Sequence, residues 1–183
     1  MDAQPSSPPL LVLEAGLLGA PPAGFAHDMT RTELGNGESV FRAGREALSR
    51  WDQFDLGWVR VANRDAPIAT GALVAVEAHT ALIWSINFSR ITETIDTPAR
   101  FGFLYTTTSI HVEEGQERFV LEYDEASGCV SYLIEAVSRP RHFLARIAYP
   151  FSRAMQHRFA RDSHSRMLRS VLRVAKPGGV LAG

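Results

Sequence analysis

One stretch, from Tyr105 to Pro140, constrains the fold more than any other part of the sequence, because its apolar residues recur at every second position. That period is typical of strands with one buried face. Polar turns at Glu113–Gly115 and Asp124–Gly128 divide the stretch into three parts. Arg139-Pro140 ends it, because the residue before a proline is pushed out of the helical region. We predict three consecutive antiparallel strands, over Tyr105–Val112, over Arg118–Tyr123 and from Val130 onward.

Two polar residues in this stretch are candidate catalytic groups. His111 ends the first predicted strand, and Glu117 precedes the second on the same side as Phe119. A short hairpin would bring the imidazole and the carboxylate together. Histidine titrates near neutrality and burial can raise a glutamate toward it, so a pair facing a cavity suits proton transfer. A structural ion pair at the edge of the hairpin is the alternative.

Length and composition indicate one soluble domain. The chain has 183 residues, enough for a sizeable core, and 45 % of them are hydrophobic. The single cysteine, Cys129, excludes an internal disulfide and a cysteine-based zinc cluster. No run of about 18 apolar residues is present to span a membrane. Leu10–Ala20 is apolar but contains Glu14 and lacks a basic start, so we predict no signal peptide and a cytoplasmic protein.

The net charge of −1 hides an asymmetry. Up to Ser138 the chain carries nine arginines and 19 acidic residues, whereas from Arg139 onward it carries ten basic residues and the single acid Asp162. A basic C-terminal helix could bind nucleic acid or an anionic membrane surface. We favour its packing across an acidic sheet of the same molecule, because the two charges nearly cancel and basic residues do not alternate with aromatic ones. We therefore expect no nucleic-acid partner, and a homodimer is left open.

The order of predicted elements favours an α+β fold, because a run of strands followed by a helix argues against parallel βαβ units. We predict a curved antiparallel sheet of about six or seven strands wrapped around a long C-terminal helix, with an apolar pocket between them. Residues 1–12 are expected to be a disordered tail, 13–175 a single domain and 176–183 a flexible tail. A helix is predicted from Glu38 to Trp51, and further strands over Phe25–Leu34, Trp58–Ala62, Gly71–His79, Ala81–Phe88 and Ser89–Thr94.

The C-terminal helix is predicted to extend over roughly 24 residues from Phe151, with apolar residues on one face and arginines mostly elsewhere. Pro150 is expected to interrupt it early, leaving Arg141–Tyr149 as a separate turn or short helix. Lys176 and the Pro-Gly-Gly after it end the helix.

In combination, a set of residues spread from about Leu13 to Leu172 resembles a known family. The sequence is similar to the bacterial and plant family of domains of unknown function numbered nineteen-ninety. The resemblance rests on Pro22-Ala23-Gly24-Phe25, Leu34-Gly35-Asn36-Gly37, Phe41, Ala43, Ala47, Leu48, Trp51, His111, Glu114-Gly115, Glu117, Phe119, Glu122, Ser138-Arg139-Pro140, Gln156 and Phe159.

The resemblance implies a START-like, helix-grip architecture. Relatives with that architecture bind hydrophobic small molecules, and some are polyketide cyclases or dehydratases, which implies by analogy a similar role here. This sequence departs from the family pattern at three places. Thr107–Ile110 replaces a Gly-Thr-Leu-type strand, Gln116 stands where glutamate is common, and Ala26 stands where a second histidine is common. We interpret these changes as the mark of a specialised member with its own ligand.

Neither a metal nor a cofactor is predicted. His157 and His164 are seven residues apart, without the i, i+4 spacing and carboxylates that a metal site needs. No glycine-rich loop connects a strand to a helix, and no Gly-x-Ser-x-Gly elbow is present. His27 beside Asp28 is a weaker catalytic candidate.

Aromatic residues of the sheet and apolar residues of the last helix are candidate ligand contacts, with core packing as the alternative for each. A tyrosine hydroxyl needs a partner when buried and could orient an oxygen on a ligand. The predicted substrate-binding residues are Tyr105, Tyr123, Tyr132, Trp84, Phe103, Phe119, Met155 and Phe159.

Two functions fit these features. The first is a cofactor-free cyclase or dehydratase that acts on a hydrophobic, oxygenated metabolite in polyketide-type or antibiotic biosynthesis, for example by spiroketal or cyclic-ether formation. His111 and Glu117 would supply acid–base catalysis, and the apolar pocket would hold one folded conformer of the substrate. The alternative is a non-catalytic carrier of a lipid or another small hydrophobic ligand.

Overall fold

The computed structural model describes residues 23–80, 83–109, 113–140 and 149–175. Within these ranges the strands form one seven-stranded antiparallel sheet in the order β1-β7-β6-β5-β4-β3-β2. Only the pairing of β1 with β7 joins strands that are distant in the chain. The strands are β1 (Ala26–Asn36), β2 (Val59–Val61), β3 (Leu73–Thr80), β4 (Ile83–Asp96), β5 (Arg100–Thr107), β6 (Glu113–Tyr123) and β7 (Cys129–Pro140).

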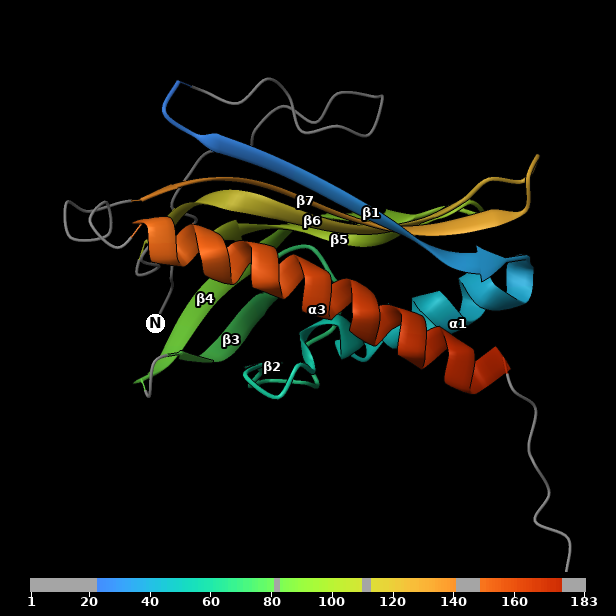
Figure 1. Ribbon diagram of the computed structural model, residues 1–183, viewed down its shortest axis with the longest axis horizontal. Helices are drawn as coiled ribbons and strands as arrows, with labels where there is room; N and C mark the ends of the chain where they lie inside the picture. The colour runs from blue at the N-terminus through green and yellow to red at the C-terminus, as the bar shows by residue number, and fades with distance from the viewer. Residues whose placement is uncertain (1–22, 81–82, 110–112, 141–148, 176–183) are drawn as a thin grey trace, which may run out of the picture.

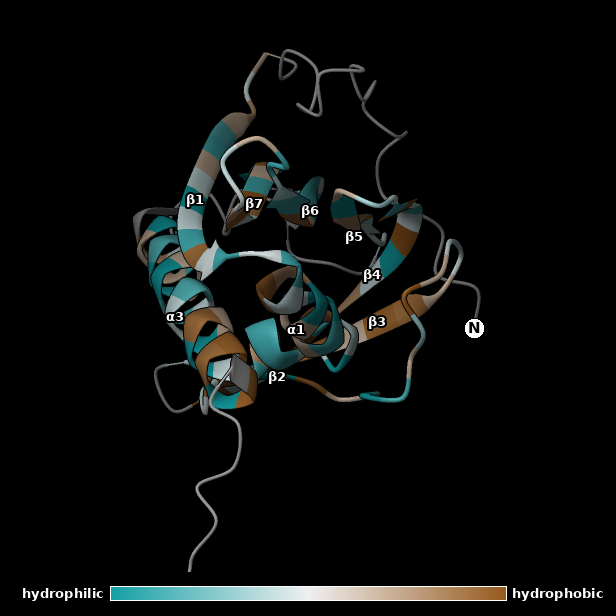
Figure 2. Cartoon of the chain, turned by 90° about the vertical axis from the view of Figure 1, so that its right-hand side faces the viewer, coloured by the Kyte–Doolittle hydropathy of each residue, from teal (hydrophilic) through white to brown (hydrophobic). Residues whose placement is uncertain are grey.

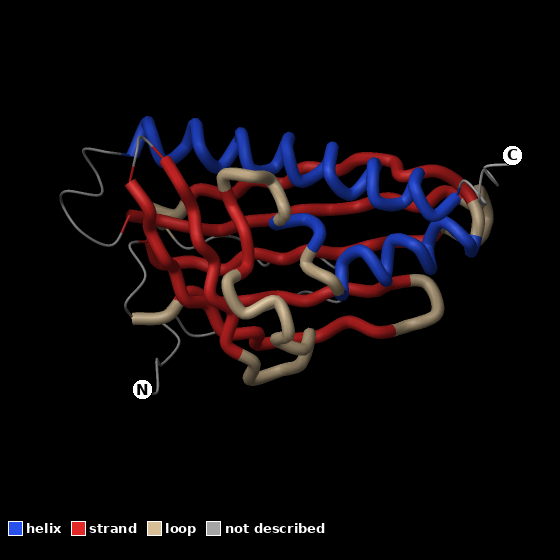
Figure 3. Tube along the Cα trace, turned by 90° about the horizontal axis from the view of Figure 1, so that it is seen from below, coloured by secondary structure: helices blue, strands red, loops and turns tan. Residues whose placement is uncertain are grey.

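The helices lie inside the curve of this sheet. α3 (Tyr149–Ala175) crosses the concave face, and α1 (Glu38–Ser49), followed by the 3₁₀ turn η1 (Asp52–Phe54), lies beside the C-terminal half of α3 (Figure 1). The sheet curls around both helices from β1 to β3 (Figure 2). Seen from below, both helices lie on the same side of the strands (Figure 3). The prediction of a helix-grip α+β fold is confirmed.

α3 begins earlier than the sequence predicts. Pro150 is its second residue, where a missing N–H breaks no intrahelical bond and the fixed φ of proline suits the first turn. A proline at this place is compatible with the predicted break before the long helix, which stays a prediction. Of the predicted separate turn Arg141–Tyr149, only Tyr149 lies within the described residues. In the described ranges, no helix combines the length and the apolar character that crossing a membrane requires.

Three strands differ from their predictions. β5 spans Arg100–Thr107, whereas the prediction was a strand over Tyr105–Val112, of which residues 110–112 lie outside the described residues. β4 runs unbroken from Ile83 to Asp96, where two strands are predicted, and a bulge after Ile91 lets it follow the curve of the sheet. β6 begins at Glu113 instead of Arg118, because Gly115 lets its backbone come very close to β7. A Cβ on Gly115 would lie 2.2 Å from the carbonyl oxygen of Val137. The predicted turn at 113–115 is therefore part of the sheet.

The apolar core fills the end of the curve next to α1. Trp51 leaves α1 in a left-handed conformation, with φ 63°, and its indole N–H donates a hydrogen bond to the carbonyl of Ala66 at 3.0 Å. Its ring meets Phe103 edge-on at 5.1 Å. Met167 and Val171 of α3 are fully buried in the same cluster. Apolar side chains therefore fill this end of the molecule, which we call the packed end.

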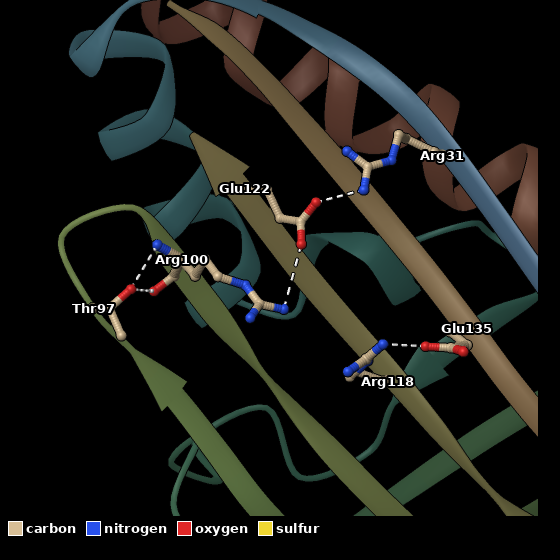
Figure 4. Close-up of polar contacts among 6 residues, drawn as sticks. All are labelled: Arg31, Thr97, Arg100, Arg118, Glu122 and Glu135. Atoms are coloured by element: carbon tan, nitrogen blue, oxygen red, sulfur yellow. Dashed lines mark hydrogen bonds and ion pairs between the residues drawn. The ribbon is translucent and has the colours of Figure 1, made fainter. Parts of the chain in front are cut away.

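Ion pairs mark the outer, convex face of the sheet (Figure 4). Arg118 and Glu135, directly opposite each other on β6 and β7, form a salt bridge that is almost fully buried. Farther along, Glu122 accepts from Arg31 at 2.5 Å and from Arg100 at 3.3 Å. Because successive residues of a strand point to opposite faces, these charges point away from α3.

The basic charge of α3 is balanced in part by other elements. Arg153 forms an ion pair with Asp28 of β1, and Arg166 forms one with Asp55 at 2.8 Å. These contacts agree with the expectation that the basic helix packs across acidic parts of its own molecule.

Candidate functional site

A cavity of about 360 Å³ lies between the concave face of the sheet and the N-terminal half of α3. Its walls are largely apolar. Phe54 of η1 and Phe159 of α3 lie with ring centroids 5.2 Å apart on one side, and Ile134 and Ala136 of β7 line the sheet side. A cavity of this size and character fits a small, mostly apolar molecule.

One polar pair faces the cavity from the middle of the sheet. Tyr105 on β5 and Glu117 on β6 are directly opposite each other, and the tyrosine hydroxyl donates a hydrogen bond to a carboxylate oxygen at 2.5 Å. Hydrogen bonds from O–H groups to carboxylates are short and strong. The Tyr105 ring is itself held by Phe103, Phe119 and Phe54. The pair is thus a hydrogen-bond donor and acceptor held in place by the surrounding aromatic rings.

Next to this pair the wall becomes small and polar. Thr107 and Gly115 line the cavity, and they form two hydrogen bonds with each other. The Gly115 N–H donates to the threonine hydroxyl at 3.0 Å, and that hydroxyl donates to the Gly115 carbonyl at 3.2 Å. The threonine side chain therefore takes the place of a ladder partner, and the missing side chain of Gly115 lets β6 approach β7 closely at the cavity wall.

Two carboxylates share one row of the sheet. Glu117 on β6 and Asp28 on β1 are each directly opposite Ala136 on β7, and all three residues line the cavity. Because neighbouring strands are about 4.8 Å apart, the backbones of the two acids are separated by roughly 10 Å. Only a methyl group lies between them, so the floor of the cavity is flat and acidic at both sides.

Asp28 belongs to a second polar cluster, which joins α3 to the sheet. Arg153 donates to both of its carboxylate oxygens and also, at 2.9 Å, to the amide oxygen of Gln156. The Gln156 amide N–H donates to the Ser138 hydroxyl at 3.2 Å. The hydrogen bonds from Arg153 lower the pKa of Asp28 below its usual 3.8. Asp28 is therefore ionised at neutral pH and holds Arg153 across the end of the cavity.

The described histidines have other partners. His27 points to the outer face, where its Nε2 lies 2.8 Å from Glu135, although its neighbour Asp28 faces the cavity. His157 lines the cavity and lies 3.4 Å from Arg153. His164 is half-buried, and burial lowers its pKa below 6.5. His27 and Asp28 thus do not act as a pair.

The predicted site residues are divided between the cavity and its surroundings. Glu117, Tyr105, Met155 and Phe159 line the cavity. Phe103 and Phe119 are fully buried behind it and support the Tyr105 ring. His111 lies outside the described residues.

The remaining three predicted contacts lie elsewhere. Tyr132 is fully buried, with its hydroxyl 3.2 Å from that of Ser163. Tyr123 stacks on Phe41 of α1 at 5.8 Å. Trp84 lies on the outward side of β4, 57 % exposed.

The sequence reasoning missed Asp28, Ser138, Arg153 and Gln156 as lining or organising residues of the cavity. Their signal was available in part. Gln156 and Ser138 belong to the residues that carry the family resemblance. The pairing of β1 with β7, which brings Asp28 into the row of Glu117, joins residues 108 positions apart and leaves no local pattern.

Comparison with known proteins agrees with this fold. The family model described as "Domain of unknown function (DUF1990)" matches residues 12–166. The chain belongs to this family. A UPF0548 protein of Dictyostelium discoideum is 35 % identical over 158 residues, which cover 80 % of this chain and 73 % of that protein. The UPF0548 protein At2g17695 of Arabidopsis thaliana is 30 % identical over 154 residues, which cover 81 % and 74 % of the two chains.

The fold of this DUF1990 member also occurs in solved structures of distant sequence. The crystal structure of the Zhui aromatase/cyclase from Streptomyces sp. R1128 superposes with a TM-score of 0.54 and 13 % identity. The match covers 85 % of this chain and 98 % of that one. At this identity the likeness shows a shared fold only.

Proposed function

We propose that this protein binds a hydrophobic, oxygen-bearing small molecule in its cavity and catalyses cofactor-free ring closure or dehydration of it. The observation that carries the proposal is the Tyr105–Glu117 pair, which faces a cavity with otherwise largely apolar walls. A carboxylate in such a place can exchange protons with a bound substrate, and the walls exclude bulk water from the reaction.

The chemistry needs one group that takes and returns a proton. In spiroketal formation, a first substrate hydroxyl adds to the carbonyl carbon, and Glu117 carries its proton to the former carbonyl oxygen, which gives a hemiketal. A second substrate hydroxyl then forms the other C–O bond while the hemiketal C–OH bond breaks. Glu117 carries the proton of this second hydroxyl to the leaving hydroxyl, so that one water is released and the protein is unchanged. Tyr105 holds the carboxylate in place and can donate to a substrate oxygen once the substrate separates the pair.

The distribution of polar groups suggests the class of ligand. Glu117 with Tyr105 lies on one side of Ala136, and Asp28 with Arg153 and Gln156 lies on the other. A molecule with oxygen functions near both ends and an apolar middle would meet both groups and cover the alanine. Linear hydroxy-ketones of the polyketide type have this pattern, and a spiroketal or cyclic ether would be the product.

A second candidate function is carriage without catalysis. It is favoured by the fact that both carboxylates of the row already have partners within the protein, Glu117 with Tyr105 and Asp28 with Arg153. In that case the pairs only hold the strands and α3 in place, and a lipid or another hydrophobic molecule occupies the cavity unchanged.

Ligand recovery from the native host separates the two functions. The protein is purified from that host, native mass spectrometry detects any bound mass, and the extracted ligand is returned to fresh protein. We expect wild-type protein to convert it with a loss of about 18 mass units, the mass of one water. A ligand that binds and returns unchanged contradicts catalysis and supports carriage.

Variants test whether Glu117 carries out the proton transfer. Glu117→Gln keeps the shape of the side chain but cannot accept a proton, so we expect binding without conversion. Glu122→Gln is the matched control, because Glu122 lies on the same strand but points to the outer face. Equal conversion by wild-type and Glu117→Gln protein would refute the role of Glu117. His111→Ala tests the predicted partner in the same assay.

A further inference from the structure

The wall of the cavity that β3 and β4 form carries polar groups outside the two clusters described above. Successive inner residues of β4 are Ile91, Ser89, Asn87 and Ser85, because alternate residues of a strand share a face. Ile91 belongs to the buried core and Ser89 is 3 % exposed, whereas Asn87 and Ser85 line the cavity. The inner face of β4 therefore changes from apolar to polar toward the cavity.

Asn87 is the polar member of an otherwise apolar row. It is directly opposite Val76 on β3, which in turn is directly opposite Val61 on β2. Val76 lines the cavity, and Val61 is buried in the core. A polar group among apolar neighbours is unfavourable unless it forms a hydrogen bond, so an aliphatic side chain would suit the fold at least as well. Folding alone therefore does not explain the amide at this position.

Within the residues that the structure describes, the Asn87 amide has no hydrogen-bond partner. Two other amides border the cavity, and both are paired. Gln116 donates to the Thr106 hydroxyl at 3.0 Å, and Gln156 donates to the Ser138 hydroxyl at 3.2 Å. Asn87 is half-buried and lines the cavity, so its amide can bind a ligand without first breaking a hydrogen bond of the protein.

The amide of Asn87 is suited to neutral oxygen groups. Its N–H groups donate to a carbonyl or ether oxygen, and its own carbonyl accepts from a hydroxyl. Because the amide carries no charge, it gives a carboxylate or an ammonium group less than a charged partner would give. The chemistry of this wall therefore favours an uncharged part of the ligand.

Asn87 lies beyond the Tyr105–Glu117 pair, on the side away from Asp28. Ile91 is directly opposite Tyr105, and Asn87 is four positions farther along β4. Strand geometry separates the backbones of Tyr105 and Asn87 by roughly 14 Å along the sheet. Asp28 lies on the other side of Glu117, in the same row. The cavity thus presents three polar positions, with the Tyr105–Glu117 pair in the middle.

We propose that Asn87 is a specificity-determining residue, which binds a hydroxyl or carbonyl oxygen at one end of the ligand. The Tyr105–Glu117 pair then meets a central oxygen, and the cluster of Asp28 and Arg153 meets the other end. The substrate class is thereby narrowed to an apolar chain with three neutral oxygen groups, such as a ketone flanked by two hydroxyls. Asn87 would serve this role in a carrier as well as in an enzyme, so the proposal rests on the ligand binding of the proposed function and not on catalysis.

Calorimetric titration of the full chain with two probes tests the role of Asn87. The first probe is a linear nine-carbon triol, with a hydroxyl at each end and one on the central carbon, and the second probe lacks one end hydroxyl. Asn87→Leu keeps the approximate size of the side chain but removes its hydrogen-bonding groups. We expect this variant to lower the preference for the triol about fivefold relative to the wild type, which is the effect of one neutral hydrogen bond. The second probe can turn its apolar end toward position 87, so its affinity should change little.

Ser85→Ala is the matched control. Ser85 lies on the same strand and also lines the cavity, but its hydroxyl already donates to the carbonyl of Ala78 at 3.4 Å. We expect this variant to keep the preference of the wild type for the triol. Circular dichroism checks that each variant is folded.

An equal loss of affinity for both probes in Asn87→Leu would show that the residue only shapes the wall, and an unchanged preference would show that the ligand does not reach it. Either result overturns the proposal, and so does a loss of preference of the same size in Ser85→Ala. Failure of the wild type to bind either probe would overturn the role of Asn87 together with the proposed function. Conversion of the native ligand that does not depend on Glu117, with the preference due to Asn87 intact, would refute the proposed catalysis alone.

Discussion

The two ends of the sheet are built on the same pattern but filled differently. Three neighbouring strands place one residue each in every cross-strand row on the concave face. Next to α1 the first row is Phe101, Leu121 and Tyr132, and the second is Phe103, Phe119 and Ile134. Toward the start of α3 the rows become Tyr105, Glu117 and Ala136, and then Thr107, Gly115 and Ser138.

The side chains shrink and become polar from row to row, whereas the backbone ladder continues unchanged. At the packed end, large apolar side chains meet α1 and the second half of α3. At the other end the same helix meets small and polar residues, and a cavity remains. The taper in side-chain size therefore determines where a ligand can bind, and no change in topology is needed to create the site.

The sharpest test of this comparison removes an aromatic ring from each end. Phe103→Ala at the packed end should destabilise the protein by about 3–5 kcal/mol, because the side chain is fully buried and leaves a void. Phe159→Ala at the cavity should cost roughly 1–2 kcal/mol, because one side of the ring already faces open space. Urea denaturation measures both losses, and equal losses would contradict the division into a packed and an open end.

The reverse substitution adds volume at each end. Ala47→Leu in α1 should cost about 1–3 kcal/mol, because Ala47 has no accessible surface and the extra atoms find no room. Ala136→Leu should change stability by less than about 1 kcal/mol, because the cavity accepts the side chain.

The two substitutions should rank in the opposite order for ligand binding, because the one that changes stability less should weaken binding more. Ala136→Leu fills the floor between the two carboxylates, so we expect it to weaken binding of an apolar fluorescent dye, anilinonaphthalene sulfonate, by about tenfold or more. Ala47→Leu should leave binding by the folded protein unchanged. Dye binding that is insensitive to Ala136→Leu would place the bound dye outside the cavity.

The alternation in Tyr105–Pro140 was enough to predict antiparallel strands there, because the period of two that buries one face of a strand is local. The same residues also contain the taper: Phe119, Glu117 and Gly115 occupy successive positions on one face. The sequence thus indicated one side of the cavity. It also predicted Glu117 and Tyr105 as site residues, which line the cavity together.

The other side of the cavity was not predictable in this way. Asp28 meets the row of Glu117 only through the pairing of β1 with β7, and Arg153 meets Asp28 only through the packing of α3. These contacts join parts of the chain more than a hundred residues apart. The positive charge of the C-terminal helix also does not indicate which of its arginines pairs with Asp28. Tyr123 and Tyr132 share the face of Glu117 but lie nearer the packed end, so parity identifies the face without giving the position along it.

The ion pair at the cavity end gives a smaller effect, which depends on pH. The hydrogen bonds from Arg153 lower the pKa of Asp28 in the folded protein below 3.8, so the folded state binds fewer protons than the unfolded state near that pH. The stabilisation is therefore complete above pH 3.8 and is lost as the pH falls through the folded pKa. Asp28→Asn should cost about 1 kcal/mol at neutral pH, because the pair is partly exposed, and the cost should vanish in acid. A cost that is constant with pH would indicate packing instead of charge.

A second effect that depends on pH comes from the boundary between the two ends. His164 of α3 contacts the cavity residue Thr30, Nε2 to hydroxyl at 2.8 Å, and meets the buried Tyr132 ring edge-on at 5.3 Å. Burial lowers its pKa, so the unfolded chain binds this proton more readily than the folded one. Stability should therefore decrease as the pH falls below 6.5, with a slope of at most one proton, about 1.4 kcal/mol per pH unit, and level off below the folded pKa.

A His164→Gln variant should lose that slope, since glutamine can still donate to or accept from Thr30 but does not titrate. Urea denaturation of the variant and the wild type between pH 7 and about pH 5 measures the difference, on the side of 6.5 where an unperturbed histidine becomes charged. Because Asp28 titrates only below 3.8, the two groups are separated by pH. An unchanged slope in His164→Gln would mean that a group other than His164 changes its proton binding on unfolding in this pH range.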